Sequence, residues 1–433
     1  MKFWTTGILM TLGVLFPTLA FGQGPWGASG APAAGYYDPA FAGGGYPGVY
    51  DQLLPERNGL DPGDSQFRLL SFREAFAESY LRLDYLHWNI SGGDGTLLGA
   101  PVSSSTPGLP PPDLSGRDRN NLLPANDPVT GSPPLTYAIV PRLGDAFDTL
   151  NGLRGTIGIP TNLGTLESEV FYFEQASNTL SIDPYIDTQT PFSTSTIIPA
   201  TTLFNNGSLS PNRMIVYNDG YSAAQKTTFW GAEANWIFNP TVPNTGLEIS
   251  PILGFRYLGL DDSLTIAGRN IQSSSVTLNH MISSLARNHI FGPQIGLRAD
   301  TMLGPYLEIG VETKFLAGIN SMDQSVRTSE IFNPTTSSDP TQATELPFID
   351  EDHRTRFAPV FDLALTGKLQ LSPHFKLFAS YEFLLGGGFS RAFKNINYDS
   401  PASVTSPPTI RYKSDLQEFM AHGFAVGGEF VFR

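Results

Sequence analysis

Residues 291–320 read FGPQIGLRADTMLGPYLEIGVETKFLAGIN, two alternating segments joined by the turn MLGP at 302–305. Apolar residues occupy every second position from Phe291 to Ala299 and, apart from Thr313, again from Leu307 to Ile319. Successive side chains of a strand point to opposite faces, so each segment has one apolar face and one polar face. The alternation outlasts the about 5–6 residues of a typical soluble strand and reaches the roughly 9–11 of a transmembrane strand. One such hairpin is a weak signal, and repetition along the chain decides the fold.

The alternating pattern recurs in ten segments along the chain. They cover residues 79–90, 150–159, 165–175, 230–238, 247–258, 291–300, 307–319, 357–371, 375–383 and 424–432. Short turns are expected at residues 160–164, 239–246, 302–305 and 372–374. Long polar loops are expected at residues 91–147, 176–226, 261–287, 321–354 and 387–413. Strict alternation of short turns and long loops is typical of outer-membrane barrels and has no reason to occur in a soluble sandwich.

The sequence therefore predicts an all-β fold, an antiparallel up-and-down transmembrane barrel over residues 76–433. We expect about ten strands, with twelve as the alternative if residues 67–77 or the third loop also pair. Short turns and both chain ends would be periplasmic, and the long loops extracellular. Aromatic residues near the two ends of the segments resemble interfacial girdles. They are Trp236, Phe238, Phe375, Phe430 and Phe432 at the short-turn end, and Trp230 and Phe291 at the other.

Composition limits the other classes of protein. The 433 residues include no cysteine and carry a formal charge of −14, which disfavours nucleic-acid binding and excludes disulfides and thiolate metal sites. An apolar run after Lys2 ends in Ala20-Phe21-Gly22, which predicts a secretory signal peptide over residues 1–22. Residues 23–75, rich in Gly, Pro and Tyr, are expected to form a periplasmic tail. We therefore expect export through a cleaved signal peptide into the outer membrane of a Gram-negative cell envelope.

Four motifs resemble a known group of proteins. They are YLRLDYLHW at 80–88, GLRGTIG at 152–158, GFRYL at 254–258 and FGPQIGLR at 291–298. With them the chain resembles, over residues 80–433, the seventh family of planctomycete outer-membrane β-barrel proteins. The resemblance implies an outer-membrane barrel and no assigned substrate or reaction. The final alternation also resembles the signal read by the barrel-assembly machinery, offset by one because Arg433 follows Phe432. Expected partners are therefore outer-membrane lipid and that machinery, with no nucleic acid and with unknown loop ligands.

The polar face of the segments is rich in charges. Charges that face lipid cost up to about 2–4 kcal/mol each, so these side chains should line the lumen. The candidates are Arg82, Asp84, Arg154, Glu233, Glu248, Arg256, Arg298, Glu308, Glu312, Lys314, Asp362, Lys368, Lys376 and Glu382. Glu167, Glu169 and Glu429 share the face. Such a lining can select ions in a porin, or it can fill a narrow barrel with paired charges. We favour the filled lumen, in a structural, surface-exposed barrel with at most a narrow solute path.

Other chemistry has little support in the sequence. The six histidines show no close ligand pair of the H-E-x-x-H kind. The run Asp350-Glu351-Asp352-His353 lacks EF-hand spacing, which favours a solvated acidic loop over a calcium site. His87 and Asp84 lie on opposite faces of one strand and make a poor dyad. We expect no cofactor, no metal and no enzymatic activity, although a barrel-embedded hydrolase built from several strands stays a minor alternative.

Overall fold

The computed structural model describes residues 79–90, 95–100, 122–125, 135–143, 149–183, 195–198, 200–203, 214–241, 246–273, 276–331, 348–398 and 410–432. The expected signal peptide, the expected tail and the ambiguous residues 67–77 lie outside these ranges. Among the described residues, no helix is long and apolar enough to cross a membrane.

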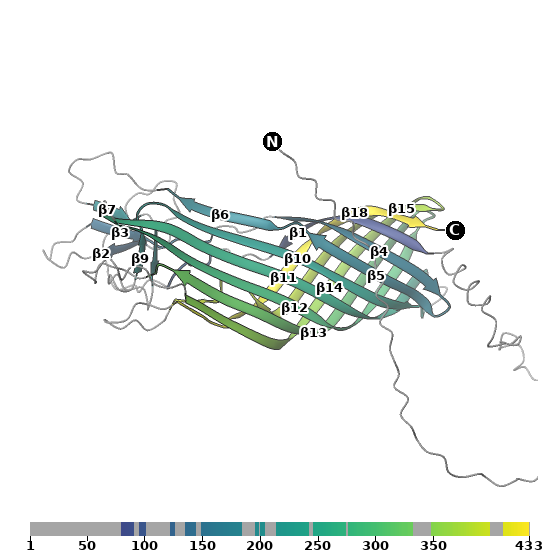
Figure 1. The fold of residues 1–433 in the computed structure, drawn as a ribbon. Coiled ribbons are helices and arrows are strands. Elements are labelled where there is room, and N and C mark those ends of the chain that lie inside the picture. Colours follow the sequence, from purple (N-terminus) through teal and green to yellow (C-terminus); the bar gives the residue numbers. More distant parts are fainter. Residues whose placement is uncertain are drawn as a thin grey trace, which may run out of the picture. The chain divides into compact units, whose positions relative to one another are not determined.

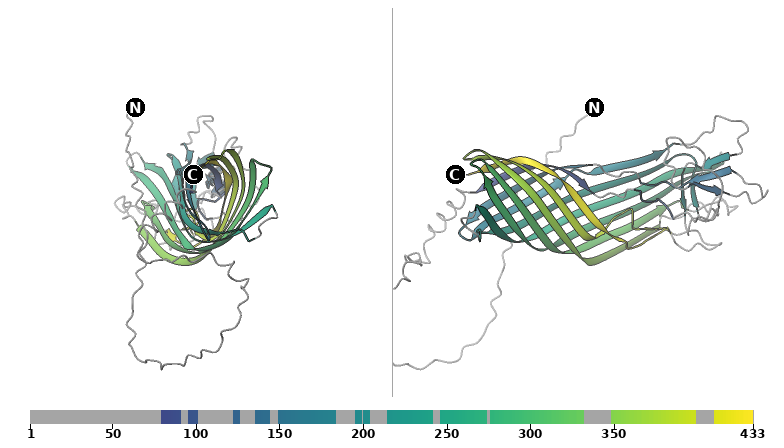
Figure 2. Two further views of the ribbon diagram at one scale, coloured as in Figure 1. Left: turned by 90° about the vertical axis from the view of Figure 1, so that its right-hand side faces the viewer. Right: turned by 180° about the vertical axis from the view of Figure 1, so that it is seen from behind.

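Ten antiparallel strands form a closed ring (Figures 1 and 2). They are β1 (Tyr80–Ile90), β4 (Leu150–Thr161), β5 (Gly164–Phe173), β10 (Tyr221–Phe238), β11 (Leu247–Ser273), β12 (Val276–Leu303), β13 (Leu307–Ser329), β14 (Phe348–Ser372), β15 (Phe375–Ser390) and β18 (Leu416–Val431). Each strand pairs with its neighbour in the chain, and β18 pairs with β1 in the register Tyr80↔Val431. Closure removes the free edges of the sheet, as a lipid environment requires. The predicted all-β barrel of ten strands is confirmed.

The first and the last residues of the barrel lie at the same end of it as the short turns. The backbone N–H of Phe432 donates to Ser79 O at 2.8 Å, at the end of the barrel where β4 turns into β5 and β14 into β15. Gly164 and Gly304 adopt positive φ in two of these turns, a conformation that favours glycine.

The predicted polarity of the two faces holds in the half of the barrel nearest the short turns. On β1, Leu83 is 61% exposed on the outer surface, whereas its neighbour Asp84 is 2% exposed inside. On β12, Ile295 and Leu297 face outward, while Gln294 is buried inside. Apolar side chains outside and polar side chains inside are what a lipid-facing barrel needs.

Only one of the five expected long loops, residues 261–287, is almost entirely strand where the structure describes it, so the prediction of a loop there was wrong. The other four contain strand ends or short strands among their described residues. Strands β10 to β14 are 18–28 residues long, far beyond the about 9–11 needed to cross the membrane. They continue past the ends of β1, β15 and β18 as an extension of the barrel (Figure 1). Residues 261–273 and 276–287 form the halves of β11 and β12 that lie away from the short turns, which we call the upper halves. Asp350, Glu351 and Asp352 lie on β14 instead of in an acidic loop.

The strands were missed at residues 261–287 because their two faces exchange polarity there. The outer face changes from apolar to polar, and the inner face changes from polar to apolar. On upper β12, Ile282 and Ala286 are buried inside, while Ser283 and Arg287 face outward. The outer face is polar because it meets water, and the inner face is apolar because it packs on a core. The apolar outer face that suits contact with lipid therefore ends near Phe291, although β12 itself continues beyond that point.

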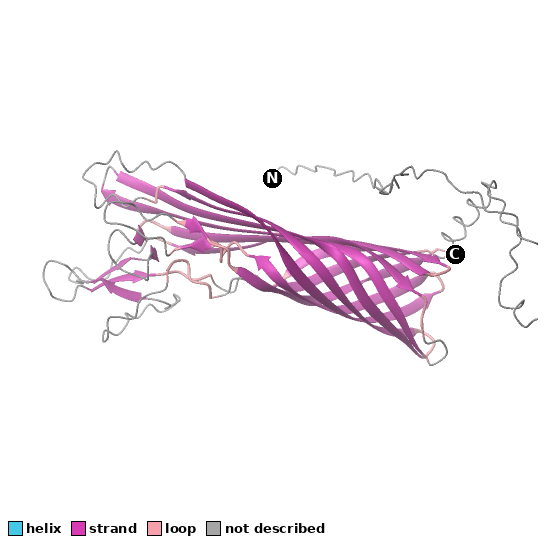
Figure 3. Cartoon of the chain, turned by 90° about the horizontal axis from the view of Figure 1, so that it is seen from below, coloured by secondary structure: helices cyan, strands magenta, loops and turns pink. Residues whose placement is uncertain are grey.

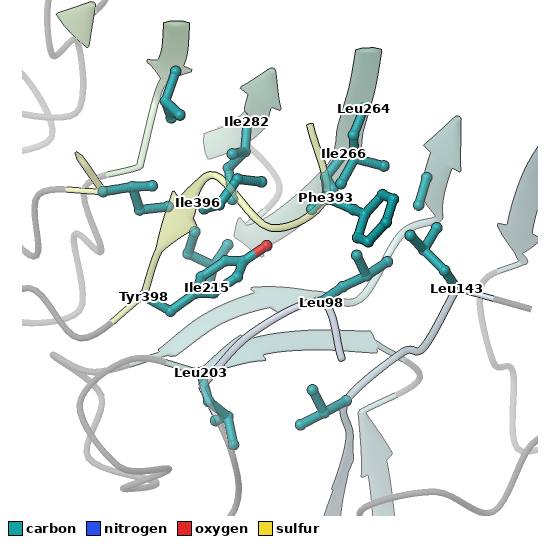
Figure 4. Packing of buried hydrophobic residues seen from close by; sticks show 14 of the residues in the cluster. Leu98, Leu143, Leu203, Ile215, Leu264, Ile266, Ile282, Phe393, Ile396 and Tyr398 are labelled. Carbon is teal, nitrogen blue, oxygen red and sulfur yellow. The ribbon is translucent and has the colours of Figure 1, made fainter. Parts of the chain in front are cut away.

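Short strands lie at the far end of this extension (Figure 3). β6 (Ala176–Ile182) continues the line of β5 and pairs with upper β10. β2 (Leu122–Ala125), β3 (Leu135–Ile139) and β7 (Ser195–Ile198) form one small sheet, β8 (Ala200–Leu203) pairs with β9 (Met214–Tyr217), and β16 (Ile396–Asn397) pairs with β17 (Arg411–Tyr412). An apolar core ties this end together, in which Leu98, Leu203 and Ile215 pack with Ile282 and Phe393 (Figure 4).

Candidate functional site

Charged side chains from nine strands of the ring meet inside the barrel near the short-turn end. Arg82, Asp84, Arg154, Glu167, Glu169, Glu233, Arg256, Lys314, Asp362, Glu382 and Glu429 are buried there. Each sits at an inward position of its strand, between outward apolar neighbours, so the strand alternation alone delivers it to the lumen. We call this set, together with Arg298 and Glu312, the charged layer.

Arg154 on β4 is the centre of one group of ion pairs. Its two terminal nitrogens, Nη1 and Nη2, donate to the two carboxylate oxygens of Glu382 on β15 at 2.9 and 2.6 Å. Its Nε donates to Asp84 on β1 at 2.9 Å. Arg82 lies 3.4 Å from both Asp84 and Glu169, and its guanidinium stacks 4.7 Å from the centre of the Phe378 ring. Two-pronged pairs of this kind fix the guanidinium in one orientation.

A second group joins the opposite wall of the barrel. Arg256 lies 3.2 Å from Glu233 and 2.7 Å from Asp362. Lys314 donates to Glu233 at 2.6 Å and lies 2.8 Å from Glu312. Arg298 then connects Glu312, at 2.5 Å, to Glu167, at 3.1 Å. The pairs cross between strands far apart in the ring, so the charges span the lumen and do not merely coat its wall.

The remaining predicted lumen residues lie nearer the mouth of the barrel at the short turns. Lys368 donates to Glu308 at 2.8 Å, and Lys376 lies 3.6 Å from Glu308 and 3.5 Å from Glu429. Glu308, Lys368 and Lys376 are only partly buried. Glu248, at the start of β11, is exposed and takes part in no ion pair among the described residues. The structure thus brings together all the predicted charges except Glu248.

A layer of aromatic side chains lies on the side of the charged layer that is away from the short turns. Trp88, Phe171, Phe173 and Phe229 are all buried, and the rings of Phe171 and Phe229 lie 5.3 Å apart. The Phe229 ring also lies 5.3 Å from the ring of Phe419, which stacks on Phe389 at 4.9 Å. Sequence reasoning missed this layer. The signal was present, because Phe171 and Phe173 continue the inward positions of Glu167 and Glu169 on β5. We call these six residues the aromatic layer.

Residues 387–398, which we call the strap, leave β15 and turn into the barrel. Gly388 has a φ of +77°, and its carbonyl accepts a hydrogen bond from the Asn320 side chain at 2.9 Å. The Asn288 amide donates to Ser390 O at 2.8 Å, and its oxygen accepts from Ser390 N at 2.8 Å. Residues 387–398 of the expected fifth loop are therefore an internal element.

A buried charge pair fixes the far side of the strap. Arg391 Nε lies 3.1 Å from Asp262 Oδ2, which also accepts from the Ala392 N–H at 3.0 Å. The other Asp262 oxygen accepts from Thr227 at 2.8 Å and from Gln225 at 3.3 Å. The strap then adds Phe393, Ile396 and Tyr398 to the apolar core of the extension (Figure 4).

A cavity of about 50 Å³ lies in the charged layer, bordered by Arg82, Arg154, Glu169, Lys314 and Asp362. One water occupies about 30 Å³ of the liquid, so the cavity holds only a few waters. Among the described residues, no group of three His, Asp or Glu side chains is arranged to hold a metal ion.

Two titratable groups of the extension are strongly affected by burial. Burial lowers the pKa of His280, whose Nδ1 contacts the backbone oxygen of Glu330. Burial also raises the pKa of Tyr398, with a further rise from the charge of a nearby Tyr217 phenolate. Both groups are therefore neutral at physiological pH, as their apolar surroundings require.

A closed antiparallel ring with an apolar outer belt and a charged interior defines the class of protein as an outer-membrane β-barrel. A family model described as "Putative beta barrel porin-7 (BBP7)" matches residues 80–432, and the chain belongs to this family. The resemblance drawn from the four sequence motifs is thereby confirmed. No curated protein matches the chain.

Solved structures of other outer-membrane proteins are similar at low identity. The outer membrane protease OmpT from Escherichia coli is 9% identical, with a TM-score of 0.36, and the match covers 82% of this chain and 97% of that chain. The outer-membrane expressed OmpT of Vibrio cholerae is 9% identical, with a TM-score of 0.12 and coverage of 82% and 97%.

Proposed function

We propose that this protein is a sealed outer-membrane barrel that carries a structured extracellular extension at the cell surface, with at most a narrow solute path. One observation carries the proposal. The lumen is filled in three successive levels, the charged layer, the aromatic layer and the strap, and the charged layer leaves a cavity of only about 50 Å³.

Each level opposes ion passage for a different physical reason. In the charged layer the lining groups are paired with each other, so they offer no free charge that could replace the hydration shell of an ion. In the aromatic layer, rings 4.9–5.8 Å apart are in contact and leave no room for a column of water. Apolar constrictions of this kind block ions because water does not wet them.

The extension supports a role at the surface. β11 and β12 have 27 and 28 residues, and about 9–11 residues are enough to cross the membrane. The part above the membrane has its own apolar core and a polar outer face, which is the construction of a water-soluble domain. The proposed role is therefore that of a structural, surface-exposed barrel, without enzymatic activity, cofactor or metal.

The second candidate is a porin for small solutes or ions, and the family description favours it. This function requires the strap and the aromatic layer to move aside, since both cross the lumen. A barrel-embedded enzyme is a minor third alternative.

We also propose the expected route to the membrane. Residues 1–22 would be removed as a signal peptide, residues 23–75 would stay in the periplasm, and the barrel-assembly machinery would insert residues 76–433 among outer-membrane lipids. The lumen-facing charges would act as packing groups and not as ligands for solute.

A liposome-swelling assay tests the sealed barrel. Purified protein in liposomes should give no faster swelling in arabinose than protein-free liposomes, whereas a general porin in the same lipid should. Fast swelling that scales with the amount of folded protein would support the porin instead. Folding is checked in every sample by a heat-modifiable band on a gel.

A further inference from the structure

A pocket of about 300 Å³ lies in the extracellular extension, between the strap and residues 95–99. Its apolar wall consists of Leu97 on one side and Phe393, Ile396 and Tyr398 on the other. Its volume is at the lower limit of the about 300–1,000 Å³ that is usual for small-molecule sites. It is separate from the charged layer, with which it shares no residue.

Both walls of the pocket are fixed by backbone hydrogen bonds. On one side, Gly95 N donates to Leu143 O at 2.9 Å, and Leu98 N donates to Pro141 O at 3.0 Å. On the other side, Lys413 N donates to Asn395 O at 2.8 Å, while the strap is held by the ion pair of Arg391 and Asp262. A ligand would thus meet a largely preformed site, which lowers the entropic cost of binding.

The charge of the lining is the second observation. Lys394 and Lys413 are its charged residues, and no Asp or Glu lines it, although the chain as a whole carries −14. Lys394 makes no salt bridge among the described residues. Lys413 lies 3.8 Å from Asp415, and both are exposed, so water weakens this pair. Two ammonium groups therefore face a pocket with no carboxylate of its own.

A buried tyrosine completes the apolar wall of the pocket. Tyr398 lines the pocket and is 8% exposed, and its OH has no hydrogen-bond partner among the described residues. Figure 4 shows Tyr398 beside Ile396 and Phe393, the other apolar members of this wall. The hydroxyl oxygen is inaccessible to solvent, so Tyr398 contributes its ring, and not its OH group, to the pocket wall.

We propose that this pocket binds a small soluble anion, a carboxylate or phosphate joined to an apolar body about the size of one aromatic ring. The anion would contact Lys394 and Lys413, and the ring would lie against Phe393, Ile396 and Leu97. A lipid is a poorer fit, because the volume is too small for acyl chains and the outer face of the neighbouring strands is polar at this level.

Calorimetric titration of full-length protein in phosphatidylcholine nanodiscs tests the proposal. The probes are phenyl phosphate and phenylacetate, with inorganic phosphate and phenol as partial ligands that lack the ring or the charge. At least one complete probe should bind saturably, and both partial ligands should bind at least tenfold more weakly, which corresponds to about 1.4 kcal/mol. Lack of saturable binding by both complete probes overturns the proposal.

Variants locate the binding. The double change Lys394→Met and Lys413→Met should weaken binding at least tenfold, and Thr96→Trp should block it by filling the pocket without changing its charge. Lys226→Met, at an exposed lysine on the outer face of β10, is the matched control and should bind like the wild type. Equal affinity in all four proteins would place the site elsewhere and overturn the proposal.

The urea midpoint of each variant shows that the barrel is folded, which separates loss of the site from loss of structure. A further titration in nanodiscs that also contain phosphatidylglycerol distinguishes the source of the ligand. Unchanged affinity supports a soluble anion, whereas competition by this anionic lipid would overturn that assignment.

Discussion

Replacing Arg154 with methionine keeps the aliphatic stem of the side chain and removes its charge from the centre of the charged layer. In the wild type, the guanidinium donates to Glu382 at 2.9 and 2.6 Å and to Asp84 at 2.9 Å. The side chains of Arg154 and Glu382 are 8% and 6% exposed, and that of Asp84 is fully buried. The substitution therefore leaves two buried carboxylates that have lost their closest positive charge.

The expected loss of stability follows from this burial. Breaking a buried ion pair by removing one partner costs about 3–5 kcal/mol. With a urea dependence of about 2–3 kcal/mol per M, the midpoint of unfolding should fall by about 1–2.5 M. In a wide, water-filled lumen the same carboxylates would be hydrated, and the loss would be that of a surface pair, about 0–1 kcal/mol.

Equilibrium unfolding in urea, followed by tryptophan fluorescence and by heat-modifiability on gels, measures the shift. Arg269→Met is the matched control, because Arg269 pairs with Asp219 at 2.9 Å on the surface and its side chain is 58% exposed. It should lower the midpoint by less than about 0.5 M. If Arg154→Met shifts the midpoint no more than Arg269→Met does, the charged layer is hydrated and our account of the lumen is refuted.

Three further predictions concern topology, assembly and pH. Because the chain has no cysteine, Arg327→Cys on the extension should react with an impermeant maleimide on intact cells, whereas Tyr306→Cys in a short turn should not; the opposite pattern would invert the topology. Phe430→Asp puts a charge on the lipid-facing side of the closing strand, at a cost of up to a few kcal/mol, and should reduce the heat-modifiable folded band; an undiminished band would disprove the outward placement. Burial lowers the pKa of His280, so the unfolded chain takes up the proton first, and stability should fall as the pH drops from about 7 to 5. His280→Gln should flatten that fall in the urea midpoint, and an equally steep fall would exclude this histidine as its cause.

The barrel itself could be predicted because the alternation of apolar and polar residues is visible within the sequence of each single strand. A lipid-facing strand must alternate, and ten alternating segments with short turns between pairs leave few other folds. The same rule identified Arg154, Glu233, Arg256 and Lys314 as inward side chains. It could not supply their partners, since pairs such as Arg154 with Glu382 join strands that lie far apart in the sequence.

The extension was missed because only one of two patterns was sought. Above Phe291 the apolar residues of β12 change from the outer to the inner face, as Ile282 and Ala286 show. The predicted strands would have been longer if we had also searched for the position at which the apolar residues move from the outer to the inner face. The strap is harder to find, because Asn288, Asp262 and Arg391 are recognisable as its anchors only after the ring has closed.

Single-channel recording of the wild-type protein in planar bilayers tests the sealed lumen most directly. Inserted barrels should show at most small, irregular current, because the charged layer, the aromatic layer and the strap all cross the path. Insertion is verified on the recovered membranes by the folded, heat-modifiable band. A stable, large, ohmic conductance in proportion to the inserted protein would contradict the account.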